Sequence, residues 1–182
     1  MKKESSAAYI ARLAITLLLI TAVVAAGLAC VNAVTAPEIE ALNAQKTQTA
    51  IEAVLPGGGE EIAFTDDSGI VSTIYKGQSG YAVEVTPAGF NGTVTMMVGV
   101  DNSGKVLGIS IVNHTETAGL GAEAASQGAA GTAFRGQFAG MSGSVSVSKD
   151  GGQVDALTGA TITSRAVCTG VNAALNAVAK LG

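Results

Sequence analysis

Residues 155–164 read DALTGATITS, from Asp155 to Ser164. A short apolar segment over 154–157, predicted as a strand, leads into the stretch, and an amphipathic segment over 161–180 follows it. The apolar residues of that second segment recur at helical spacing, so we expect a helix that begins at Thr161. The first turn of a helix presents N–H groups and the positive end of its dipole, which favours a bound phosphate. A plain helix cap without a ligand is the alternative.

Four strand-like runs precede this stretch, at 70–76, 81–86, 93–100 and 105–112. Residues 101–104, Asp-Asn-Ser-Gly, form a tight turn between the last two runs. Short helices are expected around 122–127 and 132–138, and 144–148 alternates like a further strand. The pattern predicts an α+β fold, with a twisted antiparallel sheet and flanking helices.

The N-terminal part of the chain contains 25 uncharged residues from Leu13 to Pro37. About 20 apolar residues in a helix cross the roughly 30 Å hydrocarbon core of a bilayer, so one N-terminal transmembrane helix is predicted. A cleaved signal peptide is an alternative, but its apolar region is usually about 7–15 residues long. A lipoprotein site at Cys30 is another. The expected segments are a cytoplasmic N-terminus at 1–12, the transmembrane helix at 13–33, a helical stalk and linker at 34–59, and a folded extracytoplasmic domain at 60–182.

Charge sets the expected orientation of that helix. The residues before Leu13 carry a net charge of +2, and those after Val31 carry a net charge of −6. The positive-inside rule then predicts a single-pass protein of the cell membrane, with its N-terminus in the cytoplasm and its domain outside. The sequence has no Lys/Arg cluster, which disfavours nucleic-acid binding. One His and two Cys in the whole chain argue against a zinc site or an iron–sulfur cluster, and no metal is expected.

The spacing Asp-x-x-Thr-Gly-Ala-Thr at 155–161 resembles the signature of FMN-binding domains whose flavin is joined covalently to threonine. Residues 91–121, NGTVTMMVGVDNSGKVLGISIVNHTETAGLG, are similar to the middle of the G subunits of Rnf electron-transport complexes. The related C subunits of sodium-pumping NADH:quinone reductases share this plan. FRGQFAG at 134–140 and the single N-terminal helix also fit, so the resemblance covers nearly the whole chain.

The resemblance implies a phosphoester between FMN and the hydroxyl of Thr161, made by a separate flavin transferase that uses FAD. It places Glu116, Thr117, Leu120 and Gly121 beside the flavin, in a loop where Ala118 stands in place of the family's usual Pro. The remaining implied cofactor-binding residues belong to the motif itself: Asp155, Leu157, Thr158, Gly159, Ala160 and Thr163.

Arg165 follows Thr161 by one helical turn. Its side chain is expected either to bend back towards the phosphate or to point into solvent.

The function that the resemblance implies is that of an electron-carrying flavoprotein subunit in a membrane complex, which couples electron transfer between ferredoxin and NAD to ion translocation. Such a subunit is not a stand-alone catalyst, and no catalytic residue is assigned. Its implied partners are the other subunits of the complex, the flavin transferase during maturation, and membrane lipid. A pseudopilin-like structural subunit and a membrane-tethered flavin reductase acting alone are the alternatives.

Overall fold

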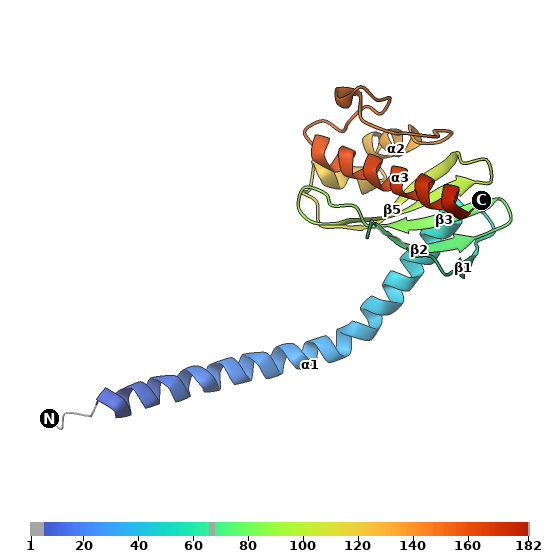
Figure 1. Ribbon diagram of the computed structural model, residues 1–182. Coiled ribbons are helices and arrows are strands. Elements are labelled where there is room, and N and C mark those ends of the chain that lie inside the picture. The colour runs from blue at the N-terminus through green and yellow to red at the C-terminus, as the bar shows by residue number, and fades with distance from the viewer. Residues whose placement is uncertain (1–5, 66–67, 182) are drawn as a thin grey trace. The chain divides into compact units, whose positions relative to one another are not determined.

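The computed structural model describes residues 6–65 and 68–181, as drawn in colour in Figure 1. Its contacts divide the chain into two units, Met1–Gln45 and Lys46–Gly182. Lys2 and Lys3, on which the predicted cytoplasmic N-terminus partly rests, lie outside the described residues.

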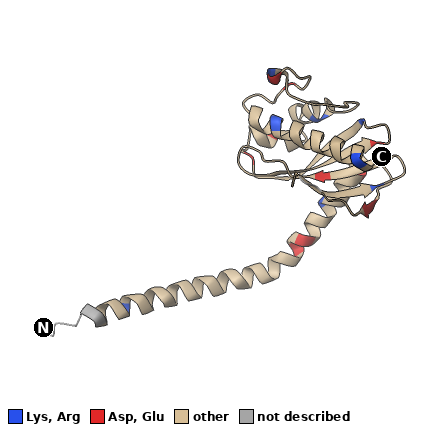
Figure 2. Cartoon of the chain, in the orientation of Figure 1, with Lys and Arg blue, Asp and Glu red and all other residues tan. Residues whose placement is uncertain are grey.

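The first unit consists of most of helix α1, which runs from Ser6 to Val54. Figure 2 shows a long stretch of this helix without charged side chains, between Arg12 and Glu38. The hydroxyl groups of Thr16, Thr21 and Thr35 each donate to a carbonyl one turn earlier, at 2.8–3.0 Å. Polar groups satisfied within the helix are what a hydrocarbon environment requires. In the described part of the chain, α1 is the one helix long and apolar enough to cross a membrane.

The second unit is built on an open, five-stranded antiparallel sheet in which every strand pairs with its neighbour in sequence. The strands are β1 (Glu60–Ile62), β2 (Val71–Lys76), β3 (Gly80–Val85), β4 (Val94–Asp101) and β5 (Val106–His114). This confirms the predicted α+β class and the four strands read from the sequence. Strand β1 was not predicted, because two of its three residues are exposed glutamates and the third is half-buried.

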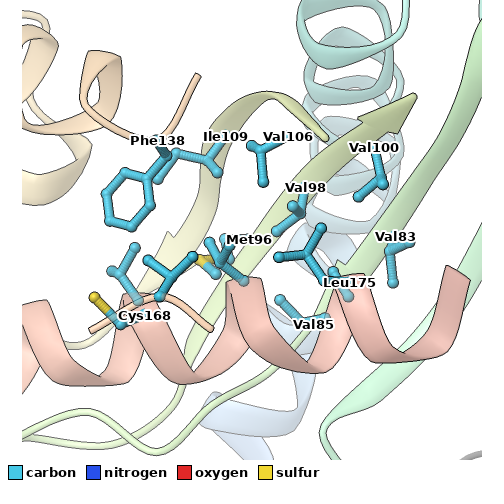
Figure 3. Close-up of a cluster of buried hydrophobic side chains, with 14 of the residues drawn as sticks. Val83, Val85, Met96, Val98, Val100, Val106, Ile109, Phe138, Cys168 and Leu175 are labelled. Atoms are coloured by element: carbon cyan, nitrogen blue, oxygen red, sulfur yellow. The ribbon is translucent and has the colours of Figure 1, made fainter. Parts of the chain in front are cut away.

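Helix α3 (Thr161–Leu181) covers one face of the sheet, as Figure 1 shows. Val83 and Val85 of β3 and Met96 and Val98 of β4 alternate with residues of the other face and join its core. In Figure 3, Cys168 of α3 lies among these side chains. Burial raises the pKa of the Cys168 thiol to about 11, with a smaller effect from the charge of Asp150. Cys168 is therefore a packing residue that stays protonated.

The last turn of α1 covers part of the opposite face. Ile51 and Val54 are 3% exposed, and they pack with Ala82 of β3 and Met97 of β4. A Cβ on Gly99 of β4 would meet the backbone carbonyl of Val54, so the helix approaches the strand as closely as glycine allows. The end of α1 therefore belongs to the folded unit that begins at Lys46.

Three short elements connect β5 to α3: η1 (Gly121–Ala125), α2 (Ala129–Gly136) and η2 (Ser148–Asp150). The helix predicted around 122–127 is a 3₁₀ turn, and the one predicted at 132–138 begins earlier, at Ala129. The strand predicted at 144–148 is absent from the described residues 68–181, and the segment at 154–157 contributes a single bridge, from Val154 to Val147. Asn172 of α3 explains why the segment at 144–148 does not form the predicted strand. Its side-chain amide accepts from Val145 N at 2.8 Å and donates to Val145 O at 2.7 Å, and so replaces a strand partner.

Candidate functional site

The motif at 155–164 folds as a tight turn that leads directly into α3. Ala160 N donates to Leu157 O at 3.0 Å, and Gly159 has φ +75°. A turn with positive φ at its third residue requires glycine there. Ser164 fixes the turn from inside the helix, because its hydroxyl accepts from Leu157 N and donates to Ala160 O, both at 3.0 Å. Thr161 is thereby placed as the first residue of α3, where it is half-buried, whereas Thr158 and Gly159 are exposed.

The start of α3 offers hydrogen-bond donors to a ligand. The N–H groups of residues 161–163 have no carbonyl one turn earlier within the helix to bond to. Their dipoles add to the positive end of a 21-residue helix. Together with the Thr161 hydroxyl, these groups form a donor set suited to a phosphate.

Glu116 ties the two predicted parts of the site together. Its carboxylate is buried and accepts from the Thr163 hydroxyl at 2.6 Å. The same carboxylate accepts from the backbone N–H groups of Phe90 at 2.8 Å and Asn91 at 3.1 Å. We expected Glu116 to line a flavin pocket. That role stays a prediction, and the hydrogen bonds of its carboxylate hold α3 and the loop before β4 against the loop after β5.

The loop at 116–121 lies directly beside the turn at 157–160. A Cβ on Gly159 would lie 2.9 Å from Cδ2 of Leu120, so this side chain sits over the turn. Gly121 is buried, and a Cβ there would collide with Glu116 and with the Thr163 hydroxyl. Thr117 is exposed, and its carbonyl accepts from Leu120 N and Ala122 N. The structure therefore brings the two sequence-predicted segments together.

Asp155 lies at the other end of the motif. Gln137 clamps its backbone: the Gln137 carbonyl oxygen accepts from Asp155 N at 2.8 Å and its amide donates to Asp155 O at 3.1 Å. An open cleft of about 580 Å³ lies here, lined by Gly119, Glu123 and Phe134 and by residues 155–158 among others. The predicted residues Asp155, Leu157 and Thr158 thus border a cleft next to the turn.

Lys149 of η2 is a site residue that the sequence analysis missed. Its Nζ donates to Thr161 Oγ1 at 3.1 Å. The next residue, Asp150, accepts two hydrogen bonds of 2.7 Å from Arg165 of α3. This pairing lowers the pKa of Asp150 and raises that of Arg165. Arg165 is exposed and pairs with Asp150, so its contact with a phosphate stays a prediction, and Lys149 is the residue that contacts Thr161.

Exposed apolar side chains surround the start of α3. Phe90, Leu120 and Ile162 are 67%, 44% and 48% exposed. Phe90 and the first turn of α3 share the Glu116 carboxylate, and Leu120 sits over Gly159. Isolated exposed apolar residues are ordinary, and these three are of interest because the segments that carry them adjoin the start of α3. Sequence analysis missed Phe90 and Ile162, because exposure has no signal in the sequence of a loop or of a first helical turn.

The comparisons with known proteins can be placed on this geometry. Residues 89–176 match the FMN-binding domain family. The range begins just before Phe90 and contains the loop at 116–121, Lys149 and the whole turn into α3. Strands β4 and β5 and the site beside α3 therefore lie in the part of the chain that matches FMN-binding domains.

Relatives that match most of the chain show which group of FMN-binding proteins it is similar to. The chain is 32% identical to the G subunit of the ion-translocating oxidoreductase complex of Methanosarcina acetivorans, over 93% of this chain and 94% of the relative. It is 35% identical to the G subunit of the Na(+)-translocating ferredoxin:NAD(+) oxidoreductase complex of Acetobacterium woodii, over 88% and 87% of the two chains. It is also 41% identical to the G subunit of the proton-translocating ferredoxin:NAD(+) oxidoreductase complex of Clostridium ljungdahlii, over a shorter match that covers 54% of this chain and 52% of the relative. The chain belongs to the family of G subunits of ion-translocating oxidoreductase complexes, which confirms the resemblance read from its motifs.

Proposed function

We propose that this chain is the electron-carrying flavoprotein subunit of a membrane complex that couples electron transfer between ferredoxin and NAD to ion translocation. FMN is attached through its phosphate to Oγ1 of Thr161. The observation that carries the proposal is the position of this hydroxyl, half-buried at the first turn of α3 within the range that matches FMN-binding domains. Family membership supports the electron-carrying role over the pseudopilin-like alternative.

The residues around Thr161 fit a phosphate ester. The donor set consists of a hydroxyl that can form the ester, the N–H groups of residues 161–163, and the ammonium group of Lys149 at 3.1 Å from the hydroxyl oxygen. Gly159 and Gly121 allow Leu120, Glu116 and Thr163 to pack against the backbone beside the start of α3, where a Cβ would displace them. Bound FMN supplies one- and two-electron transfer, while the protein positions the cofactor and tunes its potential.

The remaining site residues position and shield the cofactor. Phe90, Leu120 and Ile162 offer an apolar surface on which a flat ring tethered at Thr161 can rest. Glu116 holds this surface in place through its bonds to Thr163 and to the backbone at 90–91. Asp155, Leu157 and Thr158 border the adjoining cleft. No side chain is assigned a proton-transfer role.

Attachment requires a flavin transferase with FAD as donor. The Thr161 oxygen bonds to the flavin-side phosphorus, the P–O bond of the pyrophosphate breaks, AMP leaves and the hydroxyl proton is released. Covalent attachment suits a domain outside the cytoplasm, where free flavin is scarce and a dissociated cofactor would be lost. The apolar helix α1 anchors the subunit in lipid beside the other subunits of the complex.

Replacing the attachment residue tests this proposal. Thr161→Ala is expected to remove covalent flavin entirely, because no hydroxyl remains at the start of α3. Thr158→Ser is the matched control and is expected to retain it, since Thr158 is an exposed turn residue that keeps a hydroxyl. The measurement is flavin fluorescence of the denatured protein on a gel, with the mass of the modified peptide. A fluorescent band in Thr161→Ala would overturn the attachment.

Co-purification separates the complex subunit from a flavin reductase acting alone. The tagged, full-length chain is extracted from membranes in mild detergent, and the proteins that accompany it are identified. Integral membrane proteins in fixed ratio to the chain are expected. A flavin-loaded chain that purifies alone and reduces small acceptors would favour the reductase alternative.

A further inference from the structure

We propose that Lys149 is the cation that neutralises the phosphate ester at Thr161, and that the Asp150–Arg165 pair positions it there. The inference rests on the proposed attachment of FMN at Thr161 and assigns the charge partner of that group. In this arrangement Lys149 contacts the phosphate directly, and Asp150 and Arg165 are positioning residues that act through it.

Two adjacent residues of η2 contact two residues that lie one turn apart on α3. Lys149 Nζ donates to Thr161 Oγ1 at 3.1 Å. Arg165 Nε and Nη2 donate to the two carboxylate oxygens of Asp150, each at 2.7 Å. Because Thr161 and Arg165 are four residues apart, they lie on one face of the helix. The bidentate pair therefore fixes η2 against the face from which Thr161 projects.

The backbone around Lys149 is held by its own turn. Ser148 N donates to Val154 O at 2.7 Å, and Gly152 N donates to Val147 O at 3.0 Å. Gly151 has φ +82°, and a Cβ on Gly152 would collide with Ser146. The sequence Lys-Asp-Gly-Gly at 149–152 thus builds a turn that an L side chain at either glycine would disturb.

The charges at this end of α3 point to a role for Lys149 in binding an anion. A phosphodiester keeps one negative charge, and Asp150 would repel it. Arg165 is committed to Asp150 and cancels that charge, whereas Glu116 is buried with three donors of its own. Lys149 already contacts the hydroxyl that becomes the ester oxygen, and from this position its ammonium group can donate to the charged non-bridging oxygens of the phosphate, so that donor and acceptor are both ionised. Since Lys149 is exposed, salt will weaken the attraction.

The test compares Lys149→Gln, which removes the charge, with Lys149→Arg, which keeps it. Lys105→Gln, at an exposed lysine after the turn between β4 and β5, is the matched control. The full-length apoprotein in detergent is incubated with flavin transferase, Mg²⁺ and FAD, and the initial rate of covalent flavin incorporation is measured. Loss of a charge-assisted contact predicts a rate about tenfold lower for Lys149→Gln. Lys149→Arg and Lys105→Gln are expected to load within about twofold of the unsubstituted chain.

A second measurement does not depend on the rate at which the transferase loads the protein. In loaded protein, the ³¹P resonance of the threonyl phosphodiester is expected to shift in Lys149→Gln and to stay in place in Lys105→Gln. Arg165→Gln, which leaves Asp150 unpaired near the phosphate, is expected to slow loading as well. Unchanged loading and an unchanged ³¹P resonance in Lys149→Gln would overturn the inference, and an unchanged rate in Arg165→Gln would overturn its positioning part.

The outcome for this inference is distinguishable from that for the attachment itself. If Thr161→Ala loses covalent flavin while Lys149→Gln behaves like the unsubstituted chain, the attachment stands and the role of Lys149 falls. If Thr161→Ala keeps covalent flavin, the attachment falls, whatever the lysine variants show. The unfolding temperature of each apoprotein, compared with that of the unsubstituted chain, shows whether a slow variant is folded.

Discussion

A single buried carboxylate organises the site at the scale of residues. Glu116 and Thr163 are 47 residues apart in sequence, yet their side chains form a hydrogen bond of 2.6 Å. The motifs could be recognised separately in the sequence, and their proximity was implied by resemblance alone. The hydrogen bond that joins them could not be predicted. From the sequence alone, a carboxylate in a loop can equally be a residue that contacts a ligand or one that holds two segments together.

Replacing Glu116 is expected to destabilise the fold as well as the site. Glu116→Ala leaves the Thr163 hydroxyl and the N–H groups of Phe90 and Asn91 without their acceptor. A buried donor left unsatisfied costs about 1–3 kcal/mol, and of these three donors the Thr163 hydroxyl is the buried one, so the free energy of unfolding should fall by about 1–3 kcal/mol. Chemical denaturation of the apoprotein measures this. Glu61→Gln, at an exposed residue of β1, is the control and should change little. Equal stability of Glu116→Ala and the unsubstituted chain would show that the hydrogen bonds of the Glu116 carboxylate do not stabilise the fold.

At the scale of elements, α3 approaches the sheet so closely at Gly170 that a side chain there would force its neighbours to shift. A Cβ there would collide with Cε of Met96 and lie 3.0 Å from both Cγ of Pro87 and Cγ2 of Val85. Gly170→Val is expected to lower stability by about 1–3 kcal/mol, the usual cost of overpacking a core. Gly136→Ala at the end of α2, where a Cβ meets nothing within 4 Å, is the control and should be neutral or slightly stabilising. Thermal unfolding of both variants checks the difference, and a Gly170→Val protein as stable as the control would contradict the close packing.

The elements that could be predicted are determined by the local sequence pattern, whereas those that were missed depend on contacts with distant parts of the chain. Strands β2 to β5 have alternating or continuous apolar residues bounded by turns, and α3 has a regular apolar stripe, so local pattern was enough. Strand β1 and the segment at 144–148 depend on partners far away in the chain. Glu60–Ile62 is a strand because β2 lies beside it, and Val145 is not in one because Asn172 occupies its backbone groups. Lys149 likewise depends on a distant partner, because its position against α3 follows from the pair of Asp150 and Arg165.

At the scale of the whole molecule, α1 serves two environments. Its exposed apolar residues suit lipid, whereas Ala50, Ile51 and Val54 are buried against the sheet of the second unit. The sequence placed a stalk and linker at 34–59 and began the domain at 60. Those boundaries stay predictions, and the contacts between residues group Lys46 and the residues after it with the folded unit. The two boundaries make different predictions for a truncated protein.

A chain that begins at residue 46 is expected to be more stable than one that begins at residue 60. The shorter chain lacks Ile51, Val54 and Leu55, and burial of each such side chain contributes about 1.5–3 kcal/mol. It also uncovers Ala82 and Met97 on the sheet. Its unfolding temperature should be lower by about 10 °C or more, as calorimetry or circular dichroism would show. Equal unfolding temperatures would support a boundary at 60 and leave the last turn of α1 without a role in stability.

The physical reason for a covalent flavin depends on the orientation of the chain in the membrane. The residues before Leu13 carry +2 and those after Val31 carry −6, so the N-terminus should stay in the cytoplasm and the FMN-binding domain should be exported. Alkaline phosphatase fused after Gly182 is expected to be active, because it folds only outside the cytoplasm, and a green fluorescent protein fused at the same point is expected to be dark. Replacing Lys2, Lys3 and Arg12 together with Gln should reduce the phosphatase activity, because the charge difference that orients the helix is then lost. A fluorescent fusion with inactive phosphatase would place the domain in the cytoplasm, where free flavin is available, and would remove the physical reason for tethering the cofactor to Thr161.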